Sequence, residues 1–312
     1  MRYREFGKTG ITVSEIGLGA WQLGNRKDWA HGPDEAQSLA IVAAALDAGV
    51  TFFDTAPGYA GGESERLLGE ALRGHRDEVV LCTKFGRNPG GVDFSPEAIR
   101  GSVERSLRLL RTDVLDIVVV HSPPPELFDG RVAPHYGILE DLKREGLIRA
   151  YGGSVDFPQD IDSLLETTAS TALEVYLSAF HQETWEAVER AGDAGLGTAV
   201  KVPLESGWLA GAYGPETVFS DVRSRWSADE VRRRAALTEA FRALVPEGLS
   251  VAQAALRFAL ANRGVSTVIP GARTTAQLAG NLAAADGDLP GETVAAVRAL
   301  FARELASSPL PW

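Results

Sequence analysis

Short apolar runs alternate along this chain with longer segments in which apolar and polar positions are mixed. Apolar runs of roughly four to eight residues are typical of buried strands, and apolar positions three or four apart indicate amphipathic helices. The pattern predicts eight strands, which are Glu15–Leu18, Val50–Asp54, Val79–Lys84, Leu115–His121, Arg149–Ser154, Leu173–Ala179, Gly197–Leu204 and Ser266–Pro270. Because helical segments separate these strands, we expect them to run parallel in one sheet.

Three of the segments between strands carry signals for helices. Ser95–Arg111 begins with a favoured N-cap residue and a proline, and its apolar residues then follow one face. Ser250 and Gln253 have the spacing of a capping box and predict a helix over Val251–Ala261. A third helix is predicted over Thr274–Ala284.

Eight strands alternating with helices favour an α/β fold, a closed (β/α)8 TIM barrel, over an open doubly wound sheet, because no G-x-G-x-x-G motif follows the first strand. Arg2–Val13 has turn residues between β-prone flanks and predicts an N-terminal β-hairpin at the bottom of the barrel. Two long loops, Ser122–Ala133 and Glu205–Asp229, are expected at the C-terminal mouth. Since no linker interrupts the pattern, we expect one domain over residues 1–312.

Composition narrows the classes of partner. A net charge of −11 and a pI near 5.0 disfavour nucleic acid and anionic membranes, which both require a cationic face. The one cysteine, Cys82, lies in an apolar run, which excludes disulfides and cysteine-based metal sites within the chain. Since neither a signal-peptide pattern nor an apolar stretch of roughly 18 residues is present, we expect a cytoplasmic protein. The sequence does not determine its oligomeric state.

Among the polar residues that end predicted strands, three have titratable side chains: Asp54, Lys84 and His121. Tyr59 follows a few positions after Asp54, in the adjoining loop. The carboxyl ends of all strands in a parallel barrel meet at one mouth. We therefore expect these four side chains to lie close together.

Together the four residues suit the reduction of a carbonyl group, which needs a hydride source and a proton for the developing alkoxide. A lysine ammonium beside the Tyr59 phenol is expected to lower the pKa of that phenol. Asp54 would hold Lys84 in place, and His121 would donate to the substrate oxygen. A metal-dependent hydrolase or isomerase would need several histidines and carboxylates at strand ends, whereas His121 alone of five histidines ends a strand. No metal site is therefore expected.

Along nearly its whole length the chain resembles the aldo-keto reductases. Seven segments carry the resemblance in the family's order and spacing, and they are GLGAWQLG (Gly17–Gly24), FFDTAPGY (Phe52–Tyr59), CTKFGR (Cys82–Arg87), VVVHSPP (Val118–Pro124), LKREGLIRAYGGS (Leu142–Ser154), KVPLESGWLAG (Lys201–Gly211) and STVIPGARTTAQLAGN (Ser266–Asn281).

The resemblance implies a bacterial-type, NADP-dependent reductase that converts an aldehyde or ketone to an alcohol with NADPH. Its catalytic tetrad would be Asp54, Tyr59, Lys84 and His121, with Tyr59 as the proton donor. The substrate would lie among Trp21, Tyr59, Phe85 and His121. The implied cofactor contacts are Ala20, Trp21, Asp54, Ser154, Glu174, Pro203, Leu204, Ser206, Gly207, Ile269, Gly271, Arg273, Gln277 and Asn281.

Within this set, Arg273 supports NADPH over NADH. It opens a predicted helix, and both a helix N-terminus and a guanidinium attract phosphate. The resemblance places Arg273 at the adenosine 2′-phosphate. It places the pyrophosphate of the cofactor beneath the loop of residues 203–207. Glu205 should then point away from the cofactor, and the segment Glu205–Asp229 is expected to be a mobile lid.

Several positions depart from the family pattern near the expected nicotinamide and adenine. Val155 stands where an asparagine is usual, Glu174 where a glutamine is usual, and Ser178 at a nearby asparagine position. Gly280 replaces an acidic residue before Asn281. These changes predict altered cofactor contacts and leave the tetrad intact.

One alternative stays open, a regulatory barrel that binds the cofactor with little turnover, as some ion-channel subunits of this family do. The intact tetrad favours the enzyme. The expected partner is a small-molecule carbonyl compound, and sugar aldehydes, ketones and xenobiotic carbonyls all remain candidates.

Overall fold

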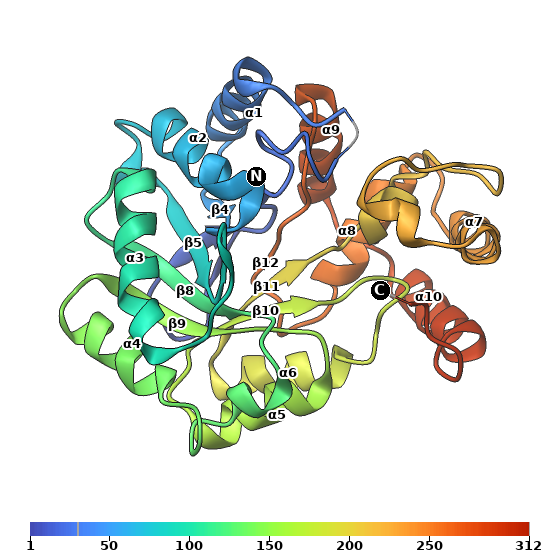
Figure 1. The fold of residues 1–312 in the computed structure, drawn as a ribbon. Coiled ribbons are helices and arrows are strands. Elements are labelled where there is room, and N and C mark those ends of the chain that lie inside the picture. The colour runs from blue at the N-terminus through green and yellow to red at the C-terminus, as the bar shows by residue number, and fades with distance from the viewer. Residues whose placement is uncertain (30, 312) are drawn as a thin grey trace.

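The computed structural model describes residues 1–29 and 31–311, and within these ranges eight parallel strands form one sheet (Figure 1). Their spatial order is β12-β11-β10-β9-β8-β5-β4-β3. The strands are β3 (Leu18–Gly19), β4 (Phe52–Asp54), β5 (Val80–Phe85), β8 (Leu115–His121), β9 (Ile148–Val155), β10 (Ala172–Tyr176), β11 (Gly197–Lys201) and β12 (Thr267–Val268).

The two edges of this sheet are joined by hydrogen bonds, so the sheet closes into a barrel. The Gly17 N–H donates to the Val268 carbonyl at 2.8 Å, and the Val268 N–H donates to the Glu15 carbonyl at 2.9 Å. Further along, the Gly19 N–H donates to the Pro270 carbonyl at 3.2 Å. The predicted barrel is confirmed.

Three predicted strands are too long at their carboxyl ends. One of them is β12, which ends at Val268 where the sequence predicted Pro270. β10 and β11 end at Tyr176 and Lys201, where the sequence predicted Ala179 and Leu204. Val202 has a φ of 54°, a left-handed conformation that a β-branched residue rarely adopts, and this turns the chain out of the sheet.

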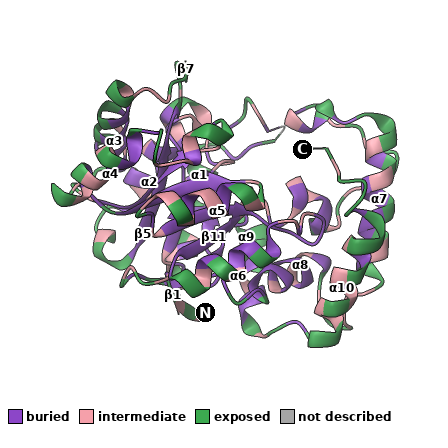
Figure 2. Cartoon of the chain, turned by 90° about the horizontal axis from the view of Figure 1, so that it is seen from below, coloured by how far each residue is buried: buried purple, intermediate pink, exposed green. Residues whose placement is uncertain are grey.

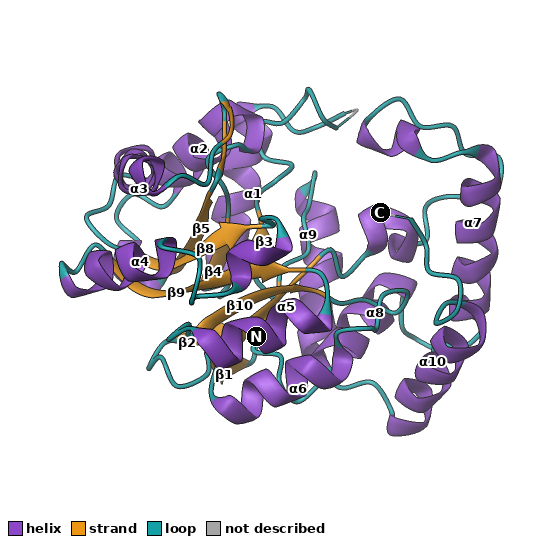
Figure 3. Cartoon of the chain, turned by 60° about the horizontal axis from the view of Figure 1, so that its bottom comes forward, coloured by secondary structure: helices purple, strands orange, loops and turns teal. Residues whose placement is uncertain are grey.

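The N-terminal hairpin closes the bottom of the barrel, as predicted. β1 (Tyr3–Glu5) and β2 (Thr12–Ser14) pair in antiparallel fashion and lie at one end of the barrel in Figure 3. Apolar residues of the hairpin pack against inward-facing strand residues in one buried cluster: Phe6, Ile11, Val13, Phe52, Val80, Cys82, Ile117, Val119, Ala150, Ala172, Ala199 and Ile269. The interior is therefore a packed core, as in other barrels of this type.

Helices surround the strands and leave their polar faces exposed (Figure 2). They are α1 (Glu35–Asp47), α2 (Glu63–Ala71), α3 (Pro96–Leu110), α4 (His135–Arg144), α5 (Pro158–Thr167), α6 (Trp185–Ala194), α7 (Ala228–Arg242), α8 (Val251–Leu260), α9 (Thr275–Leu282) and α10 (Gly291–Glu304). The three predicted helices correspond to α3, α8 and α9, and the capping box of Ser250 and Gln253 is formed. In the described part of the chain, no helix is long and apolar enough to cross a membrane.

Short elements complete the chain. They are the 3₁₀ helices η1 (Tyr59–Gly62), η2 (Arg76–Glu78), η3 (Pro125–Phe128), η4 (Glu205–Ala210), η5 (Val222–Arg225) and η6 (Ala283–Asp286), and the strands β6 (Arg87–Asn88) and β7 (Gly91–Val92). The two segments predicted as long loops contain η3 and, in the second, η4 and η5. α7 and α10 lie to one side of the barrel (Figure 1).

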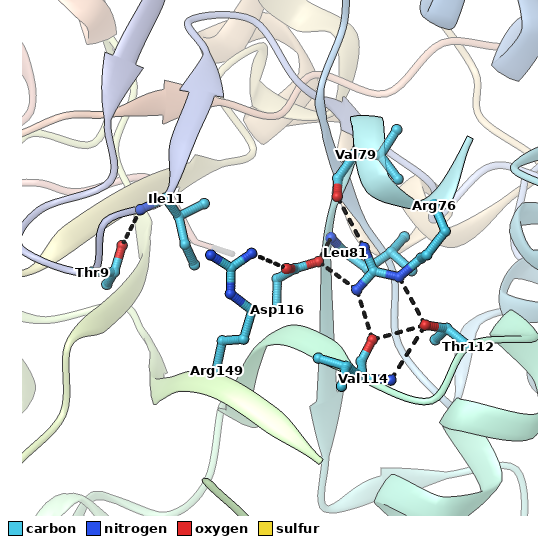
Figure 4. Close-up of polar contacts among 9 residues, drawn as sticks. All are labelled: Thr9, Ile11, Arg76, Val79, Leu81, Thr112, Val114, Asp116 and Arg149. Carbon is cyan, nitrogen blue, oxygen red and sulfur yellow. Dashed lines mark hydrogen bonds and ion pairs between the residues drawn. The ribbon is translucent and has the colours of Figure 1, made fainter. Parts of the chain in front are cut away.

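A buried carboxylate ties neighbouring strands together at the end of the barrel opposite the mouth (Figure 4). Asp116, near the start of β8, accepts hydrogen bonds from Arg76 at 2.8 Å and from Arg149 at 2.7 Å. It also accepts one from the Leu81 N–H of β5 at 2.9 Å. Both carboxylate oxygens are therefore satisfied, and the register of β5, β8 and β9 is held at this end.

Asp116→Ala should lower the free energy of unfolding by about 2–4 kcal/mol, because it removes the acceptor of a buried backbone N–H and the carboxylate that pairs with Arg76 and Arg149. Urea denaturation would measure this change, with Asp113→Ala, at an exposed neighbouring position, as the control. A loss no larger than that of the control would contradict the role assigned to Asp116.

Candidate active site

The mouth of the barrel holds a cleft of about 340 Å³, and most of the candidate residues line it. Those that line it are Trp21, Asp54, Tyr59, His121, Ser154, Glu174, Pro203, Leu204, Ser206, Gly207, Ile269, Gly271, Arg273, Gln277 and Asn281. Asp54 and His121 end β4 and β8, and Tyr59 opens η1 just beyond β4. The convergence expected from the strand ends is therefore what the structure shows.

Lys84 lies beneath the cleft floor, where its ammonium contacts two carboxylates. Its Nζ is 2.6 Å from Asp54 Oδ1 and 3.0 Å from Glu174 Oε2, and it donates to the Thr55 carbonyl at 2.9 Å. Burial opposes the charged form, but Asp54 and Glu174 outweigh burial and hold the pKa of Lys84 well above its usual value. Lys84 is therefore a buried cation.

Tyr59 lies over this cation, with Lys84 Nζ 5.2 Å from the centre of its ring. The sequence predicted a lowered pKa for the phenol. In the structure, burial raises the pKa of Tyr59, and the Asp54 and Glu174 carboxylates add to this, so the lowering by Lys84 is outweighed. That prediction is wrong in direction, because it considered the ammonium without burial or the second carboxylate. Tyr59 is a protonated phenol at neutral pH.

The pKa of Asp54 is also shifted from its usual value. Burial, followed by the negative charge of Glu174, raises the pKa of Asp54 to about 7 in spite of the attraction of Lys84. Two carboxylates around one ammonium cannot both ionise without cost. This pair therefore takes up a proton close to neutrality.

His121 faces Tyr59 edge to face, with 5.8 Å between ring centres. Its Nδ1 is buried and has no hydrogen-bond partner among the described residues. Burial, and then the positive charges of Lys84, Lys201 and Arg87, hold the pKa of His121 well below its usual value. The ring is thus neutral at physiological pH, and it can donate one hydrogen bond from one nitrogen and accept one at the other.

Aromatic residues form one wall of the cleft beside Tyr59. Trp21 stacks on Tyr59 at 6.0 Å, and Trp29 meets Trp21 edge to face at 4.9 Å. The structure does not bring Phe85 into the cleft, contrary to expectation: its ring packs against His135 in the core between barrel and helices. Side chains alternate along a strand, so Phe85 faces away from the barrel because Lys84 faces inward. Ala20 is also buried behind the cleft lining.

A charged chain of contacts runs along the cleft floor from Glu174 toward solvent. Ser154 donates to Glu174 at 3.1 Å, and Lys201 donates to Ser154 at 2.8 Å. Lys201 is also 2.9 Å from a carboxylate oxygen of Asp156, whose side chain is one-third exposed. Sequence reasoning missed Lys201 and Asp156. Lys201 could have been found as a polar residue at a strand end, since it ends β11. It was missed because the predicted strand continued to Leu204.

The part of the cleft formed by the loop after β11 is lined by backbone in left-handed conformations. Val202, Ser206 and Gly207 have φ values of 54°, 53° and 99°. Successive left-handed residues aim backbone N–H groups into a concave surface that suits an anion. The Glu205 carboxylate points away, as expected, and accepts hydrogen bonds from Tyr176 and Ser178.

The start of α9 adds a second anion-binding feature beside this loop. Arg273 lines the cleft just before the N-cap Thr274, and its N–H donates to the Gln277 side chain at 2.9 Å. Asn281 lies one turn further along the helix and donates to the Gly271 carbonyl at 3.3 Å. A guanidinium next to a helix N-terminus favours a phosphate.

Residues 205–227, called the strap below, fold over the cleft. Its aromatic side chains Trp208, Tyr213, Phe219 and Trp226 contact one another. Arg223 lies 5.2 Å from the ring centre of Trp29, and the Val222 N–H donates to the Asp28 carbonyl at 3.1 Å. The strap therefore reaches the loop that follows β3 and bridges the cleft.

One group of potential metal ligands is present among the described residues: donor atoms of Asp54, Cys82 and Glu174 lie within 4.8 Å of one another. The Lys84 ammonium contacts two of these groups. It supplies there the positive charge that a metal ion would otherwise bring.

Comparison with known proteins agrees with this geometry. A sequence model of the aldo/keto reductase family matches residues 15–302, and the chain belongs to this family. Members of the family are oxidoreductases that use nicotinamide cofactors. The chain is 31% identical to L-galactose dehydrogenase of Arabidopsis thaliana, over 90% of this chain and 87% of that protein.

Two further relatives bear on the cofactor. The NADH-specific methylglyoxal reductase of Escherichia coli is 32% identical, over 72% of this chain and 74% of its own length. Among solved structures, the holo form of the aldo-keto reductase AKR11C1 from Bacillus halodurans has a TM-score of 0.81 and 28% identity, with 96% of each chain covered.

We predict that the strap exchanges amide hydrogens more slowly once a nicotinamide cofactor fills the cleft. The strap is long and contains three glycines. Hydrogen exchange with and without NADPH would measure this, with α3 as an internal control remote from the cleft. Equal exchange of the strap in both states would refute the lid.

Proposed function

We propose that the protein reduces an aldehyde or ketone to an alcohol with hydride from NADPH and a proton from Tyr59. The observation that carries this proposal is the arrangement of Tyr59 and His121 at one cleft wall, directly above a buried Lys84. A phenol and a neutral imidazole can both donate to one carbonyl oxygen. The buried ammonium stabilises the phenolate that remains after proton transfer.

The cleft residues fit a dinucleotide in their chemistry. The loop of residues 202–207 offers backbone N–H groups for a pyrophosphate, and Arg273 with the α9 N-terminus offers a cation and further N–H groups. Ser154 and Glu174 would face the nicotinamide end, where the bound cofactor supplies hydride. Trp21 and Trp29 then leave an apolar space for the organic part of the substrate.

During reduction the chain's own groups have separate tasks. Tyr59 gives its proton to the carbonyl oxygen, and His121 holds that oxygen by a hydrogen bond. Lys84 remains charged and offsets the negative charge left on Tyr59, while Asp54 fixes the ammonium in place. The aromatic wall excludes water from the reacting groups.

Arg273 is the basis for proposing NADPH rather than NADH. A guanidinium can bind the 2′-phosphate that distinguishes the two cofactors, and no other cofactor group needs a cation at that point. One relative is an NADH-specific methylglyoxal reductase, so membership of the family does not decide between the two cofactors. The proposed preference for NADPH therefore rests on Arg273, and substitution of Arg273 tests it.

Tyr59→Phe should lower turnover with a carbonyl substrate by roughly 10²–10⁴-fold, because it removes the general acid. NADPH affinity should change little, since the phenol serves the substrate oxygen. NADPH consumption with a panel of carbonyl compounds would measure turnover, and fluorescence titration would measure affinity. Tyr151→Phe is the matched control, because Tyr151 bonds Glu140 away from the cleft. Near-normal turnover in Tyr59→Phe would point to His121 as donor, and absence of turnover in the unmodified protein would favour a regulatory barrel.

Arg273→Ala should weaken NADPH binding by about 1–3 kcal/mol and leave NADH binding nearly unchanged, because one charge-assisted contact is lost. Titration of both cofactors against both proteins would show the difference. Arg263→Ala, at an exposed ion pair with Asp193, controls for the loss of one positive charge. Equal affinity of the unmodified protein for NADPH and NADH would contradict the proposed preference.

A further inference from the structure

Glu174 gives the cleft floor a second carboxylate on the same lysine. Glu174 is 2% exposed, its Oε2 is 3.0 Å from Lys84 Nζ, and its Oε1 accepts from Ser154. Asp54 already lies 2.6 Å from the same ammonium. One carboxylate would neutralise Lys84, so when Asp54 and Glu174 are both ionised the pair carries a negative charge that Lys84 does not balance.

The other groups facing this floor do not cancel that charge. From β11, the Lys201 ammonium pairs with Asp156, which follows β9. Tyr59 beyond β4 and His121 at the end of β8 are neutral near pH 7, for the reasons given above. Cys82 on β5 is a neutral thiol, since burial raises its pKa well above the usual value. The Lys84 and Lys201 ammonium groups therefore face three carboxyl groups. Asp54 is only partly ionised near pH 7, so the excess negative charge is fractional there and grows as Asp54 ionises.

This charge lies where the nicotinamide must react. Hydride goes to the carbonyl carbon while the carbonyl oxygen takes the Tyr59 proton, so the ring must lie beside Tyr59. The ring loses a hydrogen together with the electron pair of its C–H bond, and thereby changes from neutral to a pyridinium cation. A fixed carboxylate near the ring stabilises that developing positive charge.

We propose that Glu174 electrostatically assists hydride transfer, by stabilising the positive charge that the nicotinamide gains. The proposal rests on the proposed function. It assigns to Glu174 a preference for the oxidised cofactor over the reduced one, and with it a stronger tendency of the bound reduced cofactor to give up hydride. A glutamine of the same shape would keep the polar contacts and lose this effect.

The test compares the affinities of NADP⁺ and NADPH in the unmodified protein and in Glu174→Gln. The ratio of the two dissociation constants cancels effects common to both cofactors, such as a distorted groove. Glu174→Gln should shift the ratio by about 5–20-fold against NADP⁺, and single-turnover hydride transfer to a carbonyl should slow in the same variant. Glu174→Asp, which keeps the charge, should restore most of the ratio. Glu145→Gln, at an exposed ion pair with Arg100, is the control for net charge.

The outcomes separate this inference from the proposed function. An unchanged ratio in Glu174→Gln, with both cofactors bound, overturns the inference and leaves the reductase intact. If neither cofactor binds the unmodified protein, both the inference about Glu174 and the proposed function are wrong. Equal shifts in Glu174→Gln and Glu174→Asp would trace the effect to packing and also overturn the inference.

A measurement on the unmodified protein keeps the inference testable if Glu174→Gln does not fold. Asp54 ionises as the pH rises through about 7, which adds negative charge to the same floor. The preference for NADP⁺ over NADPH should therefore increase with pH across this range. The 2′-phosphate titrates in both cofactors and cancels in the ratio, so a ratio independent of pH would count against the inference.

Discussion

The arrangement at the mouth depends on a buried ammonium that is held in a barrel by carboxylates. An isolated buried lysine would lose its proton, because transfer from water to a protein interior costs several kcal/mol. Asp54 and Glu174 prevent this for Lys84, and they come from β4 and β10, on opposite sides of β5 in the order of the sheet. Only a closed barrel brings such distant strands together around one side chain. Burial is the largest cause that keeps Tyr59 and His121 neutral, and Lys84, the largest of the nearby charges, adds to burial at His121 and opposes it at Tyr59.

The opposite end of the barrel provides the rigidity that this arrangement needs. The hairpin fills the interior with apolar side chains, and Asp116 fixes the register of the three strands that carry Lys84, His121 and Ser154. A slip of one residue in any of these strands would turn its functional side chain out of the mouth. Stability and chemistry are thus separated along the barrel axis, with packing at the bottom and polar groups at the top.

Periodicity and strand ends predicted the barrel, its hairpin and the convergence of the four polar residues. They did so because each depends on local pattern: apolar runs define strands, and parallel strands share one mouth. Phe85 was misplaced because a strand-end position alone does not say which face a side chain takes. The contact between Glu174 and Lys84 was beyond local pattern, since it joins positions far apart in sequence whose distance depends on the curvature of the sheet.

The direction of the Tyr59 pKa shows why a list of neighbours is not enough for such a site. An ammonium beside a phenol lowers its pKa when both are in water, and the sequence argument stopped there. In the structure the phenol is buried, and burial together with the charges of Asp54 and Glu174 raises the pKa of Tyr59 by more than the ammonium lowers it. A cation held beside the phenol would shift this balance toward the phenolate. In the proposed reaction a bound nicotinamide cofactor would supply such a charge, and Tyr59 would then be more acidic when the substrate oxygen needs its proton.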